Sequence, residues 1–446
     1  MGVLKIREFA QMSSGDRSAL LNRGRDAIFA PSLQSSITTI IDDVRVNGDD
    51  ALCRALRNFD GISVEPAQLR VSADEFVQAR ASLDSAVIAA IRDMIDHIRR
   101  FNEQVMERKA QDWSFESEPG LWVGEKVTPI ASAGLFCPSG KASYPSVMAQ
   151  IGAPATVAGV SRIVVITPPI PGSTAGAVDP ATLVVADELG LRDVFRVNGP
   201  AGVAAVAFGT QSIPKVVKVV GPGSPAVTCA QVEVQRYGCS TMMLLGPSES
   251  LILADDTANP TLLAADLLNE AEHGADSTVL LVTTSRALIK ATDLELERQI
   301  AMLPDTRRSA AASSLGINGG AILVASLEAG AEFANLFGPE HMQIVTADDD
   351  AMLAMMHCAG EILLGQHTSI ASANFVIGCP ASLPTSGFAN VSSGITAEAF
   401  LKRTAVARAD ETAMRRMAPS VMALADHEGF PAHANAVRVR VAGSGG

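Results

Sequence analysis

The runs Ser132-Ala-Gly-Leu-Phe136 and Arg162-Ile-Val-Val-Ile-Thr167 flank a helical stretch over residues 145–159, and this alternation decides the fold. Short apolar runs that are bounded by Gly and Pro and alternate with helices are typical of βαβ units, which build a parallel sheet. The alternation continues at residues 180–191, 193–197, 215–220, 241–246, 260–272, 277–284, 286–302, 321–326, 343–345 and 361–365. The sequence therefore predicts an α/β fold with two Rossmann-like parallel-sheet domains.

Helical segments are expected to flank this alternation at both ends. Over the first 110 residues, Ser72-Ala-Asp-Glu75 forms a capping box and residues 84–109 carry apolar side chains at a helical period. Residues 120–130 are expected to be extended, and helix returns from about residue 397. The predicted division is an N-terminal helical segment over 1–29, a discontinuous Rossmann-like domain over 30–133 and 250–396, an inserted Rossmann-like domain over 134–249, and a C-terminal helical segment over 397–446.

Length and composition indicate an ordinary globular enzyme. A chain of 446 residues with 48% hydrophobic residues exceeds one compact core, so two or three domains are expected. The net charge of −13 argues against binding nucleic acid, which requires clustered Lys and Arg. The six cysteines form no C-x-x-C pair, which excludes a zinc ribbon and suits a reducing compartment. No secretory signal and no membrane-length apolar run is visible, so a cytoplasmic protein is expected.

Acidic and imidazole side chains recur in a pattern that predicts chemistry. Glu340 and His341 are adjacent, Glu270 and His273 share a helix face, and His433 lies near the C-terminus. An α/β fold can bring these groups into one metal and acid–base site, whereas a lone Glu-His pair is more often a solvated loop. No G-x-G-x-x-G follows an expected strand, and Gly221-Pro-Gly223 is as consistent with a turn as with a phosphate cradle.

Several motifs in one order carry a resemblance to histidinol dehydrogenase along nearly the whole chain. The matching stretches are Gly134–Gly140, Tyr144-Pro-Ser146, AFGTQSIPKVVKVVGPG, Gly246-Pro-Ser-Glu249, DLLNEAEHG, Gly338-Pro-Glu-His341, LPTSGFANVSSGITAEAFLKR and His433-Ala-Asn-Ala-Val437. The resemblance implies a zinc-dependent, NAD-linked dehydrogenase that oxidises an amino alcohol through the aldehyde to the acid. It also implies a homodimer in which the C-terminal helices complete the partner's site.

The resemblance also assigns roles to residues of this chain. The acid–base pair falls on Glu340 and His341. The zinc ligands fall on Glu270, His273, Asn374 and His433, the last donated by the other subunit. Substrate contacts fall on Ser248, Glu270, His273, His341, Asn374, Glu428 and His433, and dinucleotide contacts fall on Phe136, Ala201 and Ser224.

At several of these positions the chain departs from the family. Glu270 stands where the family has Gln, and Asn374 stands where it has Asp, so the total ligand charge is unchanged. Pro380-Ala381 replaces an Asn-His pair, which removes an imidazole near the substrate. At the dinucleotide positions the family has Tyr, Gln and Asn, so the hydrogen bonds to NAD must differ.

Together these features predict a divergent dehydrogenase that uses Zn²⁺ and NAD, binds no nucleic acid or membrane, and oxidises a small polar alcohol. Two alternatives stay open. One is histidinol dehydrogenase itself with tolerated substitutions, and the other is a catalytically silent relative that binds a metal or ligand.

Overall fold

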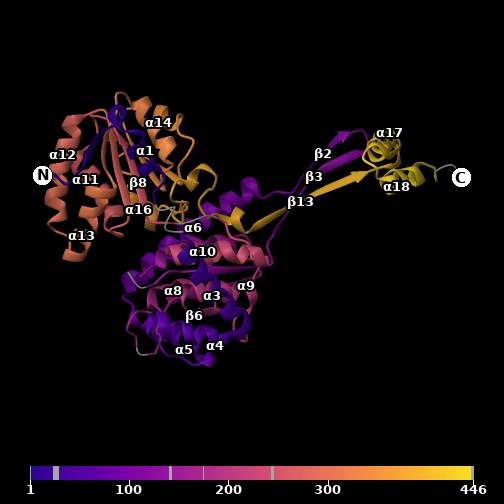
Figure 1. Cartoon of the computed structure of the whole chain (residues 1–446), viewed down its shortest axis with the longest axis horizontal. Coiled ribbons are helices and arrows are strands. Elements are labelled where there is room, and N and C mark those ends of the chain that lie inside the picture. Colours follow the sequence, from indigo (N-terminus) through magenta and orange to yellow (C-terminus); the bar gives the residue numbers. More distant parts are fainter. Residues whose placement is uncertain (1, 24–29, 140–142, 174, 243–245, 443–446) are drawn as a thin grey trace.

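The computed structural model describes residues 2–23, 30–139, 143–173, 175–242 and 246–442. The chain adopts a mixed α/β fold with two parallel sheets, and an extended arm projects from them (Figure 1). None of the helices in the described part of the chain combines the length and apolar character that crossing a lipid bilayer requires.

The larger sheet has six parallel strands and carries the site discussed below. Its order is β1 (Ile6–Glu8), β10 (Gly320–Leu323), β9 (Thr278–Thr283), β8 (Glu249–Ala254), β11 (His341–Val345) and β12 (Glu361–Leu364). Every residue of β8, β9 and β11 is buried, because helices cover both faces of the sheet. These helices include α11 (Pro260–Ala271), α12 (Arg286–Ile300) and α14 (Leu327–Phe337).

The smaller sheet has four parallel strands in the order β6 (Val194–Arg196), β5 (Arg162–Thr167), β4 (Ser132–Phe136) and β7 (Lys218–Val220). One apolar core lies between this sheet and helices α7 (Pro145–Val157) and α8 (Pro180–Glu188). A second core lies between the sheet and helices α9 (Gly199–Phe208) and α10 (Pro225–Val234).

The N-terminal helices belong with this smaller sheet, which corrects the expected grouping of residues 30–133 with 250–396. Ile37, Ile41 and Val44 of helix α3 (Pro31–Asn47) pack into the core that α9 and α10 share. Helix α4 (Asp49–Ala55) contributes side chains to the same core. Helices α5 (Ala73–Ser82) and α6 (Ser85–Lys109) pack with α8 and α7. The described residues of the 1–29 segment lie with the larger sheet, to which β1 and α1 (Ser14–Leu21) contribute.

Most local predictions are confirmed. The Ser72 capping box opens α5, α6 ends at Lys109, and the predicted strands at 132–136 and 162–167 have those bounds. The predicted run at 241–246 lies partly outside the described residues, since 243–245 are not among them.

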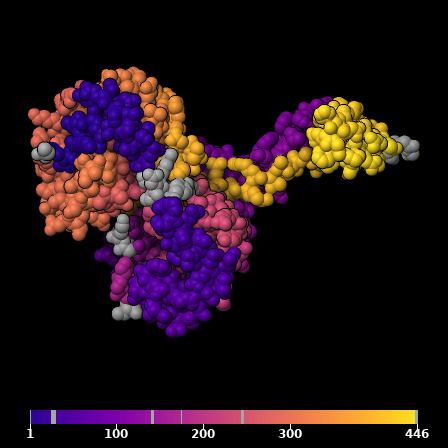
Figure 2. Space-filling model, in the orientation of Figure 1, coloured from indigo at the N-terminus to yellow at the C-terminus, as the bar shows by residue number. Residues whose placement is uncertain are grey.

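The arm corrects the expectation of a wholly helical C-terminal segment. Its antiparallel sheet consists of β2 (Trp113–Glu118), β3 (Leu121–Pro129) and β13 (Leu401–Ala409). Strand β13 pairs along its whole length with β3, so a partner distant in sequence overrides the local helical tendency of this segment. Helices α17 (Glu411–His427) and α18 (Pro431–Ala442) form the tip, well away from both parallel sheets (Figures 1 and 2).

Asn102 of α6 fixes the chain where it enters the arm. Its side chain is buried, donates to the carbonyl of Ile98 at 2.9 Å and accepts from the N–H of Ala397 at 2.7 Å. Asn102→Ala would leave a buried N–H without its partner, so we expect the free energy of unfolding to fall by about 1–3 kcal/mol in urea titrations. The exposed Asn47→Ala on α3 is the control and should change it by less than about 0.5 kcal/mol. Equal effects of the two substitutions would contradict this role.

Candidate active site

Glu340 and His341 lie at the amino end of β11, in the middle of the larger sheet. Helix α14 ends at Gly338, whose φ of 58° is left-handed, and a β-carbon there would lie 2.9 Å from Nδ2 of Asn390. The chain then enters β11 between β8 and β12, with His341 opposite Ser250 on one side and Glu361 on the other. Both side chains of the pair are buried.

The Glu340 carboxyl is held in a nearly water-free position. Its Oε2 accepts a hydrogen bond of 2.9 Å from the N–H of Glu249. Burial raises the pKa of Glu340 to about 8, because the charged form loses its hydration; His341 opposes the shift and the negative charge of Glu270 adds to it. A carboxyl with such a pKa can exchange a proton near neutral pH.

His341 contacts a carboxylate through each ring nitrogen. Nδ1 lies 2.5 Å from Oε1 of Glu361, and Nε2 lies 3.8 Å from Oε1 of Glu340. Burial alone would lower the pKa of His341, but the carboxylates of Glu270 and Glu340 and the hydrogen bond to Glu361 raise it to about 10.

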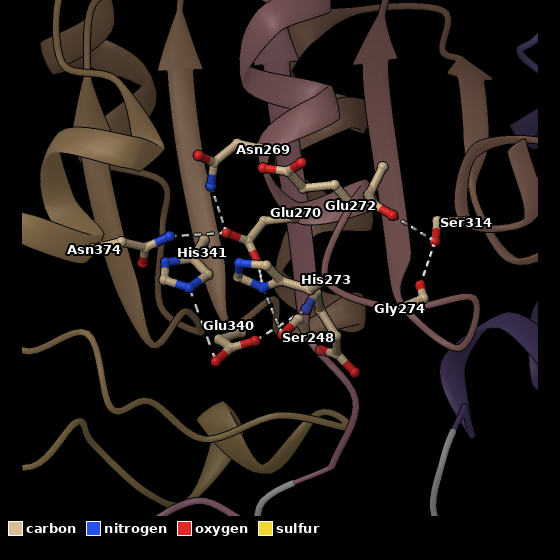
Figure 3. Close-up of polar contacts among 12 residues, drawn as sticks. Ser248, Asn269, Glu270, Glu272, His273, Gly274, Ser314, Glu340, His341 and Asn374 are labelled. Carbon is tan, nitrogen blue, oxygen red and sulfur yellow. Dashed lines mark hydrogen bonds and ion pairs between the residues drawn. The ribbon is translucent and has the colours of Figure 1, made fainter. Parts of the chain in front are cut away.

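Glu270 and His273, at the end of α11, face this pair (Figure 3). Oε1 of the fully buried Glu270 accepts from Nδ2 of Asn269 at 2.8 Å and from Nδ2 of Asn374 at 3.0 Å. Burial opposes ionisation, yet the positive charges of His273 and His341 lower the pKa of Glu270 to about 2. The Glu270 side chain is therefore an anion at the working pH of most enzymes.

The donor set around Glu270 fits a zinc ion. Among the residues that the structure describes, its buried Oε2 has no hydrogen-bond partner, although Nδ1 of His273 lies 3.1 Å away at ion-pair distance. His273 is about half exposed, at 47%, and its Nδ1 contacts Oγ of Ser248 at 3.1 Å. Asn374 of α16 (Ile370–Phe375) supplies an amide next to the same carboxylate. Carboxylate oxygen and imidazole nitrogen are ordinary zinc ligands.

The four expected metal ligands do not come together within one chain. Within the described ranges, no group of three or more His, Cys, Asp or Glu side chains is arranged to hold a metal ion. The expected residues Glu428 and His433 lie at the tip of the arm, at the end of α17 and in α18, where both are exposed. Figure 3 shows Ser248, Glu270, His273, Glu340, His341 and Asn374 together, and Figure 1 shows the arm tip far from them.

The expected dinucleotide residues gather at the carboxyl edge of the smaller sheet. Phe136 ends β4, Ala201 lies in the first turn of α9, and Ser224 precedes α10. A β-carbon at Gly223 would lie 3.1 Å from the ring of Phe136, so this glycine permits the close packing of that edge. Ligands of parallel α/β sheets bind at the carboxyl edge near helix N-termini, and the arrangement fits a dinucleotide. Ser224 is the one member of the three that is not fully buried.

Two buried carboxylates of the site went unassigned in the sequence. Glu361 is paired with His341, and Glu249 forms a 2.7 Å ion pair with Arg23, whose guanidinium lies over the ring of Phe337. Glu249 also accepts from the N–H of Ser386 at 2.7 Å. In the sequence, each of these glutamates is the one acidic residue at the start of an apolar strand. Buried acidic residues are rare unless they are paired, so this pattern could have indicated a buried ion pair.

Comparison with known proteins identifies the family to which the chain belongs. The family model described as histidinol dehydrogenase matches residues 24–441. The chain belongs to the histidinol dehydrogenase family. A histidinol dehydrogenase homolog from Colwellia psychrerythraea is 38% identical over 438 residues, covering 97% of this chain and 96% of that protein. The histidinol dehydrogenase of Synechocystis is 38% identical and covers 90% of this chain and 91% of its own length.

A solved structure extends the similarity to the whole fold. The crystal structure of histidinol dehydrogenase from Elizabethkingia anophelis aligns with a TM-score of 0.92 at 30% identity and covers 99% of each chain. Histidinol dehydrogenases are NAD-dependent, zinc-binding oxidoreductases, so the cofactors expected from the sequence agree with the family.

The raised pKa of Glu340 gives a pH-dependent stability that can be measured in chelator-treated protein. A pKa raised on folding contributes stability that is fully present below the unfolded value, near 4.5, and is lost as the pH rises through about 8. Glu340→Gln keeps an acceptor for the Glu249 N–H and removes the charge. We therefore expect the thermal midpoint of Glu340→Gln to exceed that of the unsubstituted protein at pH 9. The difference should disappear by about pH 5, since the unsubstituted carboxyl is then protonated as well.

The control is Glu103→Gln on the exposed face of α6, which should follow the unsubstituted protein at both pH values. A constant difference between Glu340→Gln and the unsubstituted protein across this range would show that Glu340 is not held protonated by its surroundings.

Proposed function

We propose that this protein is a zinc-dependent, NAD-linked dehydrogenase whose substrate is a small polar alcohol, with amino alcohols as the favoured substrate class. The observation that supports it best is the buried Glu340–His341 pair facing Glu270, whose second oxygen is buried and has no hydrogen bond within the described part of the chain. We also infer that the four-stranded sheet and its helices form a Rossmann-like domain that binds NAD at its carboxyl edge, beside Phe136, Ala201 and Ser224.

The residues of the chain divide the chemistry between them. When bound, zinc would offset the surrounding carboxylates and polarise the substrate hydroxyl, and NAD would accept the hydride from the carbon. With those charges offset, neutral His341 takes the hydroxyl proton at Nε2, and the alcohol becomes an aldehyde. If a second oxidation follows, Glu340 takes a proton from the water that attacks the aldehyde, and a second NAD would accept the hydride from the resulting hydrate.

The remaining polar groups hold the substrate and the metal. Glu270, His273 and Asn374 bind the zinc ion, and His433 supplies the fourth ligand. Ser248, beside His273, and Glu428 bind the polar end of the substrate.

Two substrates fit this site. The names of the relatives favour L-histidinol, because enzymes from Synechocystis, Bacillus subtilis and Elizabethkingia anophelis all carry the name histidinol dehydrogenase. The loop Gly378–Ala381 favours a different small polar alcohol. Ala381 occupies the position where the resemblance places an imidazole, and the loop backbone is fixed to α7 through Gln150.

We further propose a homodimer in which the arm of each subunit completes the other subunit's site. Large apolar side chains are exposed on the arm, among them Trp113, Phe115, Trp122, Leu424 and Phe430. Such a surface is characteristic of an interface. Helix α18, which carries His433, lies far from α11, which carries Glu270, and this supports the same arrangement (Figure 1).

Subunit complementation tests the shared metal site. His273→Ala and His433→Ala should each lose activity and zinc, because each removes a ligand. When the two variants are co-expressed, random pairing makes half of the dimers mixed, and each mixed dimer has one intact site. We expect recovery of about a quarter of the unsubstituted activity and zinc content.

The control is co-expression of His273→Ala with Asn374→Ala, which both lie on the body and cannot restore an intact site. Recovery in this control equal to that of the test pair would contradict the shared site. Recovery in neither pair would show that His433 does not bind the partner subunit's metal: it would either bind the metal of its own subunit or bind no metal.

Specificity is tested with L-histidinol at saturating NAD and zinc. If the loop governs the substrate, kcat/KM stays well below about 10⁴ M⁻¹s⁻¹, and a panel of small polar alcohols contains a better substrate. Ala381→His should then raise kcat/KM for L-histidinol by restoring an imidazole in the wall. A value of about 10⁴ M⁻¹s⁻¹ or more for the unsubstituted protein would assign L-histidinol instead. No NADH from any alcohol would identify a silent relative.

A further inference from the structure

Glu361 and His341 form a buried pair across two neighbouring strands. The parallel register sets His341 of β11 directly opposite Glu361 of β12. Their side chains meet with Nδ1 of His341 2.5 Å from Oε1 of Glu361, and the two side chains are only 3% and 5% exposed. The separation is that of a short, charge-assisted hydrogen bond.

No other hydrogen bond accounts for the burial of this carboxylate. Its second oxygen, Oε2, is buried and has no hydrogen-bond partner in the described part of the chain. Burying a carboxylate is costly, and buried charges are retained where they are paired or have a function. Since the contact to His341 is the one that the carboxylate makes, its role must be sought in what it does to that ring.

The contact determines which ring nitrogen is free. A carboxylate accepts but does not donate, so Nδ1 of His341 carries the proton and donates to Glu361. In the neutral ring Nε2 is then the unprotonated nitrogen, and it is the one directed toward Glu340 (Figure 3). A ring held in this way accepts a proton at Nε2, and the carboxylate stabilises the imidazolium that results.

The backbone reinforces this geometry. The N–H of Glu361 donates to the carbonyl of Glu340 at 3.1 Å, so the strand that carries the carboxylate is bonded to the residue that precedes His341. The N–H of Gly360 donates to the carbonyl of Pro339 at 2.9 Å, one residue earlier on each strand. A β-carbon at Gly360 would lie 2.5 Å from the Glu340 carbonyl, so glycine is needed for this close approach.

We propose that Glu361 is a positioning residue for the dehydrogenase reaction, which fixes the tautomer and orientation of His341 and stabilises its protonated form. The inference rests on the proposed function, in which His341 takes the hydroxyl proton. Glu361 acts through His341 and contacts no substrate atom in this assignment.

The chain offers a matched control on the same strand. Gln343 lies two residues after His341 in β11, and its Nε2 donates to Oδ2 of the buried Asp266 at 2.9 Å. Asp266 lies in α11, so this pair joins a helix to the strand; it resembles the Glu361–His341 pair in burial and involves no imidazole. Asp266→Asn therefore measures what a change of a buried carboxylate costs when no catalytic ring depends on it.

The first test is steady-state NADH production by the zinc-loaded dimer. We expect Glu361→Ala to lower kcat by about 10–100-fold with little change in KM, as for other residues that orient a functional histidine. Glu361→Gln should fall nearly as far, because an amide does not stabilise an imidazolium, whereas Glu361→Asp should keep more activity. Asp266→Asn should leave kcat within about threefold of the unsubstituted value.

The second test is the proton spectrum of the resting protein, which requires no turnover. A strongly hydrogen-bonded imidazole N–H should give a far-downfield proton signal. This signal should vanish in Glu361→Ala and in His341→Ala and persist in Asp266→Asn. Its absence from the unsubstituted protein would overturn the inference, whatever the substrate is.

The two tests separate failure of this inference from failure of the proposed function. If the unsubstituted protein produces NADH but Glu361→Ala affects kcat no more than Asp266→Asn, Glu361 has a structural role and the inference is wrong. If the downfield signal behaves as expected but no alcohol yields NADH, the contact is supported and the dehydrogenase assignment is what fails.

Discussion

The charge balance at the amino edge of the larger sheet is the constraint on which the site depends. Glu249, Glu270, Glu340 and Glu361 are all buried there. The positive groups paired with them are Arg23, His341 and His273. A buried carboxylate is stable only when it is paired with a positive group, hydrogen-bonded or protonated, and all three cases occur among these glutamates. Glu249 is paired with Arg23, Glu270 is ionised against two histidines, and Glu340 takes the proton.

This balance explains why a divalent cation suits the site. One oxygen of Glu270 is buried without a hydrogen-bond partner among the described residues, and the side chain of His273 next to it is half exposed. A cation there would lower the demand for protons on Glu340 and His341, since it compensates the same negative charges. Metal binding and acid–base chemistry are therefore coupled through one cluster of charges.

The sequence predicted what depends on neighbours along the chain and missed what depends on strand order. Period and capping signals located α5, α6 and most strands, because these are local properties. The contact of Glu361 with His341 could not be read from the sequence, because it depends on the register that sets these two residues opposite each other on β11 and β12. Strand β13 was missed for the same reason, because its stability comes from β3, far away in the sequence. The resemblance supplied the site residues that composition and spacing could not assign.

The exchange of ligand types at 270 and 374 has a physical rationale in the hydrogen bond between them. Nδ2 of Asn374 donates to Oε1 of Glu270 at 3.0 Å. In the family, by resemblance, these positions hold Gln and Asp, which can make the same bond in the opposite direction. A Glu at 270 facing an Asp at 374 would place a second carboxylate against the fully buried one, and a Gln facing an Asn would remove the anion that would attract a metal. Only a paired change preserves both the hydrogen bond and the charge, and a neutral drift at one position alone would have destroyed one of them. The hydrogen bond between Asn374 and Glu270 is therefore the observation that supports the proposed metal site at these two positions.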